Sequence, residues 1–297
     1  MGNVGSLPTS VAEPVAQWTK QRRLWNRRYF LKQDRQSRAC EHAPYGFWSF
    51  PQQKQDRGLR MAESPSQDGP CSQEKIWTHF QNSAPESFDA ARPRLDFLVR
   101  QVRKQCPFER PVVLNVGVGS GHFERQAAQQ PWEVHSLDPD ACALARLEAW
   151  NVRGHVGFIE QIPLASQSCD CVVASEVLEH LTEEQGKSAL AEVARVLKAD
   201  GVFLGTVPYH EDLSANQVVC PRCGELFHRW GHHRSFTLES LRRELAHCFT
   251  VRVLRRTAFP PFRGRSLPGK AKSLIRVVLA RCGQMIAVPS LYWRATR

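Results

Sequence analysis

Short runs of apolar, β-branched residues recur along the middle of the chain and alternate with longer amphipathic segments. The first run is Val112–Val116, and further runs lie at 132–137, 169–175 and 202–207. Runs of this length that are bounded by turn residues predict buried strands. Between the last two runs, residues 183–197 repeat apolar positions at helical spacing. This rhythm of strand, helix and strand predicts βαβ units and a parallel sheet.

The same pattern predicts elements on both sides of this central segment. The helix before the first strand is expected to pack on the sheet or to cover the bound ligand. The helix at 270–282 is basic, and we expect its apolar side to pack on the domain, with a membrane surface as the alternative. Its apolar side consists of Leu274, Ile275, Val278 and Leu279. The predicted elements are helices over 87–104, 141–150, 238–247 and 270–282, and strands over 251–256 and 291–295.

The first strand leads directly into three glycines at alternate positions. Gly117, Gly119 and Gly121 allow a sharp turn and a close approach of the backbone to a ligand, because no Cβ stands in the way. The helix-forming residues that follow place this loop at a helix N-terminus, which suits a carboxylate or phosphate group. The spacing departs from the dinucleotide fingerprint G-x-G-x-x-G, since His122 stands where the third glycine is expected.

Asp138 ends the second strand, at the same edge of the predicted sheet as the glycine loop. Ligands of open α/β sheets bind at the carboxyl ends of the strands. A carboxylate at this edge can accept hydrogen bonds from both hydroxyls of a ribose. The alternative is that Asp138 only caps the helix that follows it. Because the glycine loop lies beside it, we favour ribose binding.

Four stretches of the chain carry a resemblance to a known family. They are LNVGVGSGHFE (114–124), SLDPD (136–140), IEQIPLASQSCDCVVASEVLEHL (159–181) and EVARVLKADGVFLGTVP (192–208). These stretches resemble class I S-adenosylmethionine-dependent methyltransferases of the bacterial group that acts on small molecules and glycans, and the resemblance extends over about residues 76–297. It implies an α/β, three-layer Rossmann-like methyltransferase fold, with a seven-stranded, mostly parallel sheet whose last strand is antiparallel.

The resemblance also implies contacts with S-adenosylmethionine. Ile159 would contact the adenine, while Ser175 and Glu176 would face the sulfonium and the methyl acceptor. Asn115 stands where the family usually has Asp or Glu, so a carboxylate near the methionine ammonium would be lost. Phe158 replaces an Asp that often binds the adenine amino group. The implied cofactor-binding residues are Asn115, Gly117, Gly119, Gly121, Asp138, Ile159 and Ser175.

A second group of chemically active residues follows the fifth strand. Cys220 and Cys223 form a C-x-x-C knuckle, and His228 and His232 come soon after. Two thiolates and two imidazoles in this span predict tetrahedral zinc, and inserts with CPxCG followed by FHxWGH occur in relatives of such methyltransferases. With four protein ligands, the zinc would be structural and would hold the insert at 209–236 in shape. The alternatives are a redox-inert surface knuckle and histidines that cap or form local hydrogen bonds. A redox disulfide is less favoured, because a thioredoxin-like C-x-x-C sits at a helix start in a different βαβ context.

Methyl transfer requires that the acceptor be aligned with the methyl group, that water be excluded, and that a hydroxyl acceptor lose its proton. His210 follows the fifth strand and is our preferred base. His180, His228 and Glu176 are the other candidates. If the acceptor is a carboxylate, no base is needed.

Charge is distributed unevenly over the 297 residues, whose net charge is +11. Residues 251–297 hold eleven Lys and Arg and no acidic residue, whereas residues 71–250 hold eighteen against twenty-three. No nucleic-acid recognition motif is visible, so nucleic acid is not an expected partner. We expect the basic end to meet an anionic small-molecule or glycan substrate, membrane headgroups, or only solvent.

Composition predicts a cytoplasmic enzyme. No apolar run approaches the ~18 residues that span a bilayer, and no signal-like apolar region begins the chain. Ten cysteines in such a chain favour reduced thiols or metal ligands over disulfides. Residues 1–73 are expected to be a mostly disordered or irregular extension, with Met61 as a hypothetical native start. The methyltransferase domain is predicted over 74–297, with the predicted zinc-binding insert at 209–236 and a basic helix at 264–284.

Three functions remain open from the sequence. The first is S-adenosylmethionine-dependent methyl transfer to a small-molecule or glycan acceptor, at oxygen. The second is a catalytically inactive methyltransferase-like partner protein that still binds the cofactor, which the departures at Asn115 and Phe158 would permit. The third is a nucleotide-dependent oxidoreductase of the Rossmann type, against which the glycine spacing argues.

Overall fold

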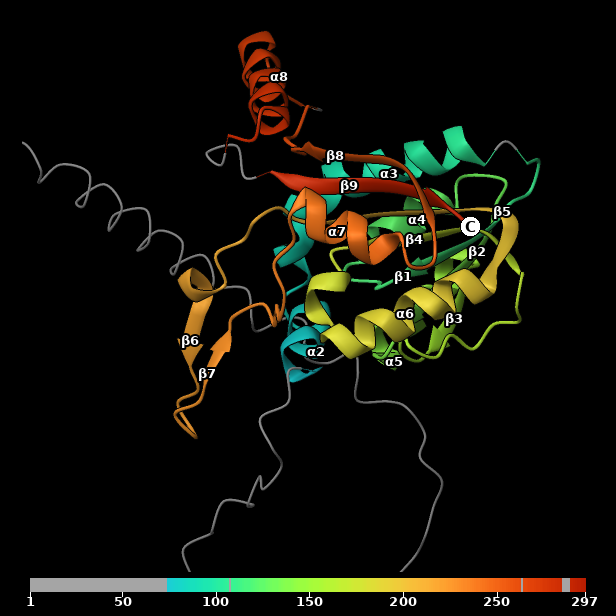
Figure 1. Cartoon of the computed structure of the whole chain (residues 1–297), viewed down its shortest axis with the longest axis horizontal. Coiled ribbons are helices and arrows are strands. Elements are labelled where there is room, and N and C mark those ends of the chain that lie inside the picture. The colour runs from blue at the N-terminus through green and yellow to red at the C-terminus, as the bar shows by residue number, and fades with distance from the viewer. Residues whose placement is uncertain (1–73, 107, 263, 285–288) are drawn as a thin grey trace, which may run out of the picture. The chain divides into compact units, whose positions relative to one another are not determined.

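The computed structural model describes residues 74–106, 108–262, 264–284 and 289–297, and the predicted extension over 1–73 with Met61 lies outside them. Seven strands form one sheet in the order β3-β2-β1-β4-β5-β9-β8 (Figure 1). β9 pairs antiparallel with both β5 and β8, while the pairs formed among β1 to β5 are parallel. The predicted fold class is therefore confirmed. The strands are β1 (Val112–Val116), β2 (Glu133–Asp138), β3 (Arg153–Val156), β4 (Cys169–Ser175), β5 (Leu197–Pro208), β8 (Thr250–Thr257) and β9 (Ser290–Thr296).

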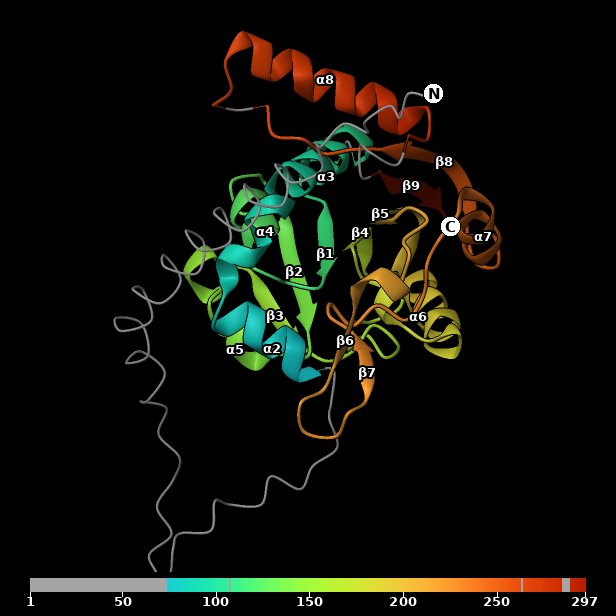
Figure 2. The same ribbon diagram turned by 90° about the vertical axis from the view of Figure 1, so that its left-hand side faces the viewer.

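Helices cover both faces of this sheet. Alternate strand residues point to opposite faces, so Val113 joins a core cluster with Leu98 of α3, and Leu114 joins a second cluster with Leu190 of α6. α3, α4 and α5 pack on the first face, and α6 and α7 pack on the second (Figure 2). The described helices are α2 (Glu74–Asn82), η1 (Pro85–Ala91), α3 (Arg92–Gln105), α4 (His122–Ala127), α5 (Ala141–Ala145), η2 (Glu148–Trp150), η3 (Leu178–His180), α6 (Glu183–Val196), η4 (Ser214–Asn216), α7 (Leu238–Leu245) and α8 (Leu267–Arg281).

Two predicted helices are divided in the structure. The helix expected over 87–104 consists of η1 and then α3, which begins with a proline in its first turn. Proline is tolerated there because it lacks only an N–H that would have no intrahelical partner. The helix expected over 141–150 consists of the short α5 and the 3₁₀ turn η2.

α8 lies beyond β8, at the edge of the sheet (Figures 1 and 2). The prediction that its apolar side packs on the domain is wrong, since Leu274, Ile275 and Val278 are 58%, 57% and 51% exposed, and Leu279 is also exposed. The side of α8 that is buried carries the small residues Ser273 and Ala280. Small side chains there allow close packing, and they leave the larger apolar residues facing outward.

None of the helices in the described part of the chain is long and apolar enough to cross a membrane.

Candidate functional site

The glycine loop has the backbone conformation that the sequence predicts. Gly117, Gly119 and Gly121 have φ angles of +82°, +54° and +73°, a region that side chains with a Cβ rarely adopt. A Cβ added at Gly121 would come within 2.9 Å of the Trp150 ring, and one at Gly119 within 3.3 Å of the Phe88 ring. The bare backbone is therefore required both for the turn and for the close approach of neighbouring residues.

Asp138 lies beside this loop at the carboxyl end of β2, and its side chain is buried. Its Oδ2 accepts hydrogen bonds from the Val118 N–H at 2.8 Å and from the Gln81 amide at 2.9 Å. Its Oδ1 accepts from the Asp140 N–H at 2.9 Å, while Asp140 itself caps α5. Burial raises the pKa of the Asp138 carboxyl. Asp138 is thus not the cap of the next helix, and it couples the glycine loop to α2.

Residues before α3 cover the loop and Asp138. Gln81 belongs to α2, and Phe88, whose ring lies against Gly119, belongs to η1. A ribose that binds Asp138 would take the position of the Gln81 amide on Oδ2. The segment 74–91 is therefore the part of the domain that covers this edge of the sheet.

Asn115 has a buried carboxyl group as its neighbour. The Oε1 of Glu124 in α4 accepts hydrogen bonds from the Asn115 amide at 2.7 Å and from the Ser136 hydroxyl at 2.9 Å. The same Asn115 amide also donates to the Gly117 carbonyl at 3.0 Å. Glu124 is fully buried, and this burial raises its pKa to about 7.

The residue predicted to contact the adenine, Ile159, is buried, and its neighbour Phe158 is exposed. Ile159 is 4% exposed and belongs to the core, whereas its neighbour Phe158 is 49% exposed. Phe158 follows β3, which pairs with β2 next to Asp138. The ring of Phe158 is therefore the larger accessible apolar surface at this end of the site.

Polar side chains gather at the carboxyl end of β4, next to the glycine loop. The Ser175 hydroxyl accepts a hydrogen bond from Arg94 Nε at 3.0 Å and lies 3.1 Å from the Thr206 hydroxyl. Glu176 has a φ of +56°, and its Oε2 lies 3.5 Å from Arg94 Nη1. A Cβ on Gly117 would lie 3.4 Å from Val177 Cγ2, so this segment adjoins the glycine loop.

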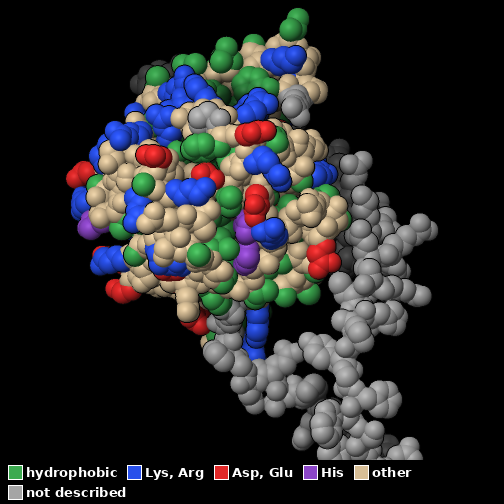
Figure 3. All heavy atoms as spheres, turned by 90° about the vertical axis from the view of Figure 1, so that its right-hand side faces the viewer, with side chains coloured by type: hydrophobic (Ala, Val, Ile, Leu, Met, Phe, Trp, Pro, Cys, Tyr) green, Lys and Arg blue, Asp and Glu red, His purple; other side chains and the backbone are tan. Residues whose placement is uncertain are grey.

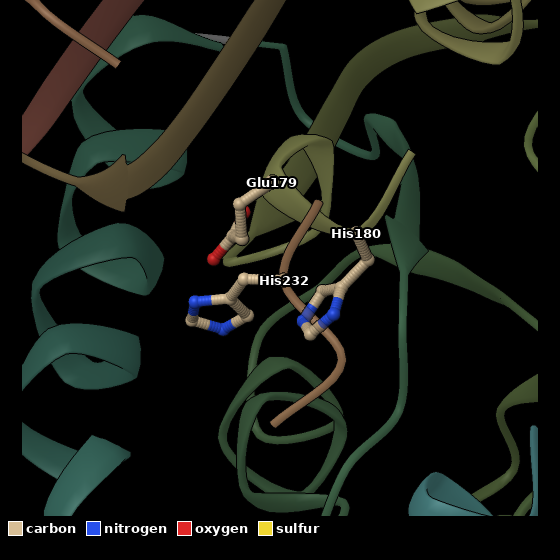
Figure 4. A group of neighbouring side chains, drawn as sticks. All are labelled: Glu179, His180 and His232. Carbon is tan, nitrogen blue, oxygen red and sulfur yellow. The ribbon is translucent and has the colours of Figure 1, made fainter. Parts of the chain in front are cut away.

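Directly after it, Glu179 and His180 of η3 meet His232 from the later insert (Figure 4). One ligand-type atom from each of the three residues lies within 4.8 Å of the others. Burial, together with His232, lowers the pKa of His180 to about 3. His180 is therefore neutral near pH 7 and a weak base. Burial and the neighbouring Glu176 raise the pKa of Glu179 well above its usual range.

The predicted Cys2His2 metal set is not assembled. The insert forms an antiparallel hairpin of β6 (Gln217–Val219) and β7 (Leu226–His228), with Cys220 and Cys223 in its turn. His228 pairs with Gln217, at the opposite end of the hairpin from that turn. Among the described residues, the three-ligand groups contain His228 and His232 but neither cysteine. Because each strand residue advances the chain by about 3.3 Å, the hairpin separates the thiols from the imidazoles.

Neither His210 nor His228 lies with the polar residues at the end of β4, where a catalytic base is expected. His210 is exposed, has a φ of +51°, and donates its backbone N–H to the Phe236 carbonyl at 2.8 Å. His228 is buried, and its Nδ1 accepts the His232 backbone N–H at 3.1 Å. The imidazoles that meet at the end of β4 are those of His180 and His232, which the sequence had assigned to separate roles.

The sequence analysis did not predict a role in the site for four residues: Gln81, Glu124, Glu179 and Glu211. Glu179 carried a usable signal, because it is a charged residue between a buried strand and a helix, three positions after Glu176. Glu124 and Gln81 carried none, since both look like ordinary residues of a helix surface. Glu211 became relevant only through its contact with His232, at 2.5 Å.

Comparisons with known proteins agree with this geometry. Residues 114–205 match a family described as a methyltransferase domain. The chain is 30% identical over 146 residues to a demethylmenaquinone methyltransferase of Chlorobaculum parvum, a match that covers 42% of this chain and 60% of that protein. It is 34% identical over 98 residues to a probable S-adenosylmethionine-dependent methyltransferase of Mycolicibacterium smegmatis, covering 32% of this chain and 37% of that protein.

Among solved structures, the fold is similar to that of 1,6-didemethyltoxoflavin-N1-methyltransferase of Burkholderia thailandensis, with a TM-score of 0.54. That structure was determined with 1,6-didemethyltoxoflavin and S-adenosylhomocysteine bound. The two chains are 16% identical, and the match covers 81% of this chain and 93% of the other. The chain thus shares the fold of this structure, and it spans only about two fifths to three fifths of the length of the two curated relatives.

Proposed function

We propose that this protein transfers a methyl group from S-adenosylmethionine to an oxygen of a small-molecule or glycan acceptor. The observation that carries the proposal is the buried carboxylate of Asp138 beside three glycines with positive φ, at the carboxyl ends of adjacent strands. Ligands of parallel sheets bind at this edge. The names of the curated relatives and the family match over 114–205 support the same reaction class.

The residues of this edge fit S-adenosylmethionine. The bare loop backbone would accommodate the methionine portion, Asp138 would accept hydrogen bonds from the ribose hydroxyls, and Phe158 would contact the adenine. When bound, the cofactor supplies an electrophilic methyl group on a sulfonium. Segment 74–91 would close over the site and exclude water, because Gln81 and Phe88 already contact its floor.

For a hydroxyl acceptor, we infer that Glu176 takes the proton. It follows Ser175 at the end of β4, and its Oε1 is buried without a hydrogen-bond partner among the described residues. His180 is less suited because of its low pKa of about 3. His210, the base preferred from the sequence, is exposed and lies outside the group at the end of β4.

The experiment combines calorimetry and turnover. S-adenosylmethionine should bind the full chain, NAD should not, and S-adenosylhomocysteine should be released when phenols, quinols or glycans are supplied. The demethylmenaquinone named for the Chlorobaculum relative places quinols in that acceptor panel. Binding without release across the whole panel would favour the inactive partner protein. Failure to bind S-adenosylmethionine would refute the proposal.

We also propose that α8 contacts an anionic membrane surface. Leu274, Ile275 and Val278 are more than half exposed, and the helix carries Lys270, Lys272, Arg276 and Arg281 with no acidic residue. Figure 3 shows hydrophobic and basic side chains together at the top of the molecule, where α8 lies. Apolar residues flanked by basic ones are typical of helices that lie in the membrane interface, and each basic residue near an anionic surface contributes about 1 kcal/mol.

The double variant Leu274→Glu/Val278→Glu is expected to bind vesicles containing phosphatidylglycerol at least about tenfold more weakly. The reason is that two apolar side chains that insert into the membrane interface would be lost. Cosedimentation measures the effect. Val156→Glu is the matched control, since Val156 is 62% exposed on the edge strand β3. Equal binding to neutral and anionic vesicles, or an effect of Val156→Glu as large, would contradict the proposal.

A further inference from the structure

Glu179, His180 and His232 form a group whose members come from two distant parts of the chain. Glu179 and His180 follow β4 within η3, and His232 follows the β6–β7 hairpin. Their ligand-type atoms lie within 4.8 Å of one another. Figure 4 shows the three side chains together, with the His180 ring pointing toward His232 and the Glu179 carboxylate above the His232 ring. The rings of His180 and His232 are nearly perpendicular, with centroids 4.7 Å apart.

Within the described part of the chain, the carboxyl group of Glu179 is buried without a hydrogen bond that would explain its burial. The residue is 0% exposed, and both of its carboxylate oxygens are buried without a hydrogen-bond partner among the described residues. A buried carboxyl group without a hydrogen-bond partner destabilises the fold, whether it is charged or neutral. The charged neighbours of Glu179 are the carboxylates of Glu176 and Glu211 and the guanidinium of Arg94.

Hydrogen bonds set both imidazoles in the form that binds a metal. His180 Nδ1 lies 3.1 Å from the Gly231 carbonyl, and His232 Nδ1 lies 2.5 Å from Glu211 Oε2. Because a carbonyl and a carboxylate accept hydrogen bonds, each Nδ1 carries the proton and each Nε2 retains its lone pair. Metal-binding histidines characteristically donate their second ring N–H to such an oxygen, which fixes the orientation of the ring.

We propose that Glu179, His180 and His232 bind a divalent transition-metal ion, with Glu211 as the positioning residue for His232. Two imidazoles and one carboxylate suit zinc or iron(II) and leave open coordination positions. The overlapping group of Glu211, His228 and His232 is less suited, because the Glu211 carboxylate already accepts hydrogen bonds from His232 and Asn216. His228 also accepts at Nδ1, so its Nε2 carries the proton.

The position of this site deepens the proposed function, on which the following step rests. η3 follows Val177, which adjoins the glycine loop at Gly117. An acceptor hydroxyl bound to such an ion would have a lowered pKa. Its proton would pass to Glu176, its oxygen would form a bond to the methyl carbon, and the carbon–sulfur bond would break with its electron pair left on sulfur. Acceptors whose hydroxyl groups can bind a metal ion, such as catechols and vicinal diols, are the substrate class that this site would favour.

Metal titration of the full chain tests this site without reference to activity. The protein is stripped with a chelator and titrated with Zn²⁺, Mn²⁺ and Co²⁺, with the visible absorption of Co²⁺ reporting the ligand field. Wild type should bind a single ion. Glu179→Gln, His180→Gln and His232→Gln should each weaken binding at least tenfold, and Glu211→Gln should weaken it about 10- to 100-fold through the orientation of His232.

Two controls separate this site from the other metal candidates. His233→Gln changes an exposed histidine next to His232, and it should leave binding unchanged. Cys220→Ser/Cys223→Ser should also leave binding unchanged, because both cysteines lie in the hairpin turn outside the three-ligand group. Circular dichroism verifies folding, and His180→Gln replaces Glu179→Gln as the decisive variant if the latter does not fold.

Each outcome bears on the inference. Absence of binding by wild type, or binding lost in the double cysteine variant but retained in His232→Gln, overturns it. Stripped protein that methylates at the full rate overturns the catalytic role of the ion. Calorimetry with S-adenosylmethionine on the same stripped protein tests the proposed function separately. Metal bound at Glu179 without any cofactor binding would refute that function while the metal site stands.

Discussion

Replacing Asp138 with alanine is expected to weaken S-adenosylmethionine binding by about 100-fold. A charge-assisted hydrogen bond to the ribose contributes about 1.5–3 kcal/mol, and the loss of about 2.7 kcal/mol corresponds to 100-fold in Kd. Asp138 also accepts hydrogen bonds from the backbone N–H groups of Val118 and Asp140. Asp138→Asn, which keeps the shape and one acceptor, should therefore weaken binding less than alanine does. Isothermal titration calorimetry measures both values.

Asp140→Asn is the matched control for this substitution. Asp140 lies two residues away and accepts hydrogen bonds from the first N–H groups of α5, a role that asparagine also fills as an N-cap. The affinity of the Asp140→Asn variant for S-adenosylmethionine should stay close to that of wild type. Unchanged binding in both Asp138 variants would remove Asp138 from the cofactor site.

Replacing Glu124 with glutamine is expected to remove a pH dependence of stability. Burial raises the Glu124 pKa from 4.5 to about 7, so its contribution to stability is fully present below pH 4.5 and is lost as the pH rises through 7. Since 1 pKa unit corresponds to about 1.4 kcal/mol, the unfolding free energy of the variant should gain on the order of 3 kcal/mol relative to wild type between pH 4 and pH 8. Urea unfolding over this range, without cofactor, measures the difference.

Glu148→Gln serves as the control for Glu124→Gln, because Glu148 is exposed in the 3₁₀ turn η2. The difference in unfolding free energy between this control and wild type should not change with pH beyond a few tenths of a kcal/mol. If the difference between Glu124→Gln and wild type is also independent of pH, the buried carboxyl group of Glu124 does not retain its proton near neutrality.

Local patterns were sufficient to predict the sheet and the loop. The apolar runs became β1, β2, β4 and β5, because a short β-branched run between turn residues has few other ways to bury its side chains. Gly117, Gly119 and Gly121 marked the turn, because only glycine adopts positive φ without strain. The position of Asp138 followed from the strand that it ends.

The same kind of reasoning failed where exposure or pairing depends on packing. The apolar residues of α8 show a helical pattern, but the pattern does not say whether another element covers them, and the structure leaves Leu274 58% exposed. The spacing of Cys220, Cys223, His228 and His232 fits a zinc site, but a hairpin separates the two pairs. Spacing along the chain predicts proximity only when the connecting segment folds back on itself.

By itself, the sequence determined the parallel sheet, the glycine loop and the carboxylate beside it, because each of these depends on residues that are neighbours in the chain. The tertiary structure alone decided that Gln81 reaches Asp138 across 57 positions and that Glu124 binds the Asn115 amide. It also brought His232 to Glu179 and His180. Such contacts form when loops from different strands pack at one edge of the sheet, and no local periodicity encodes that packing.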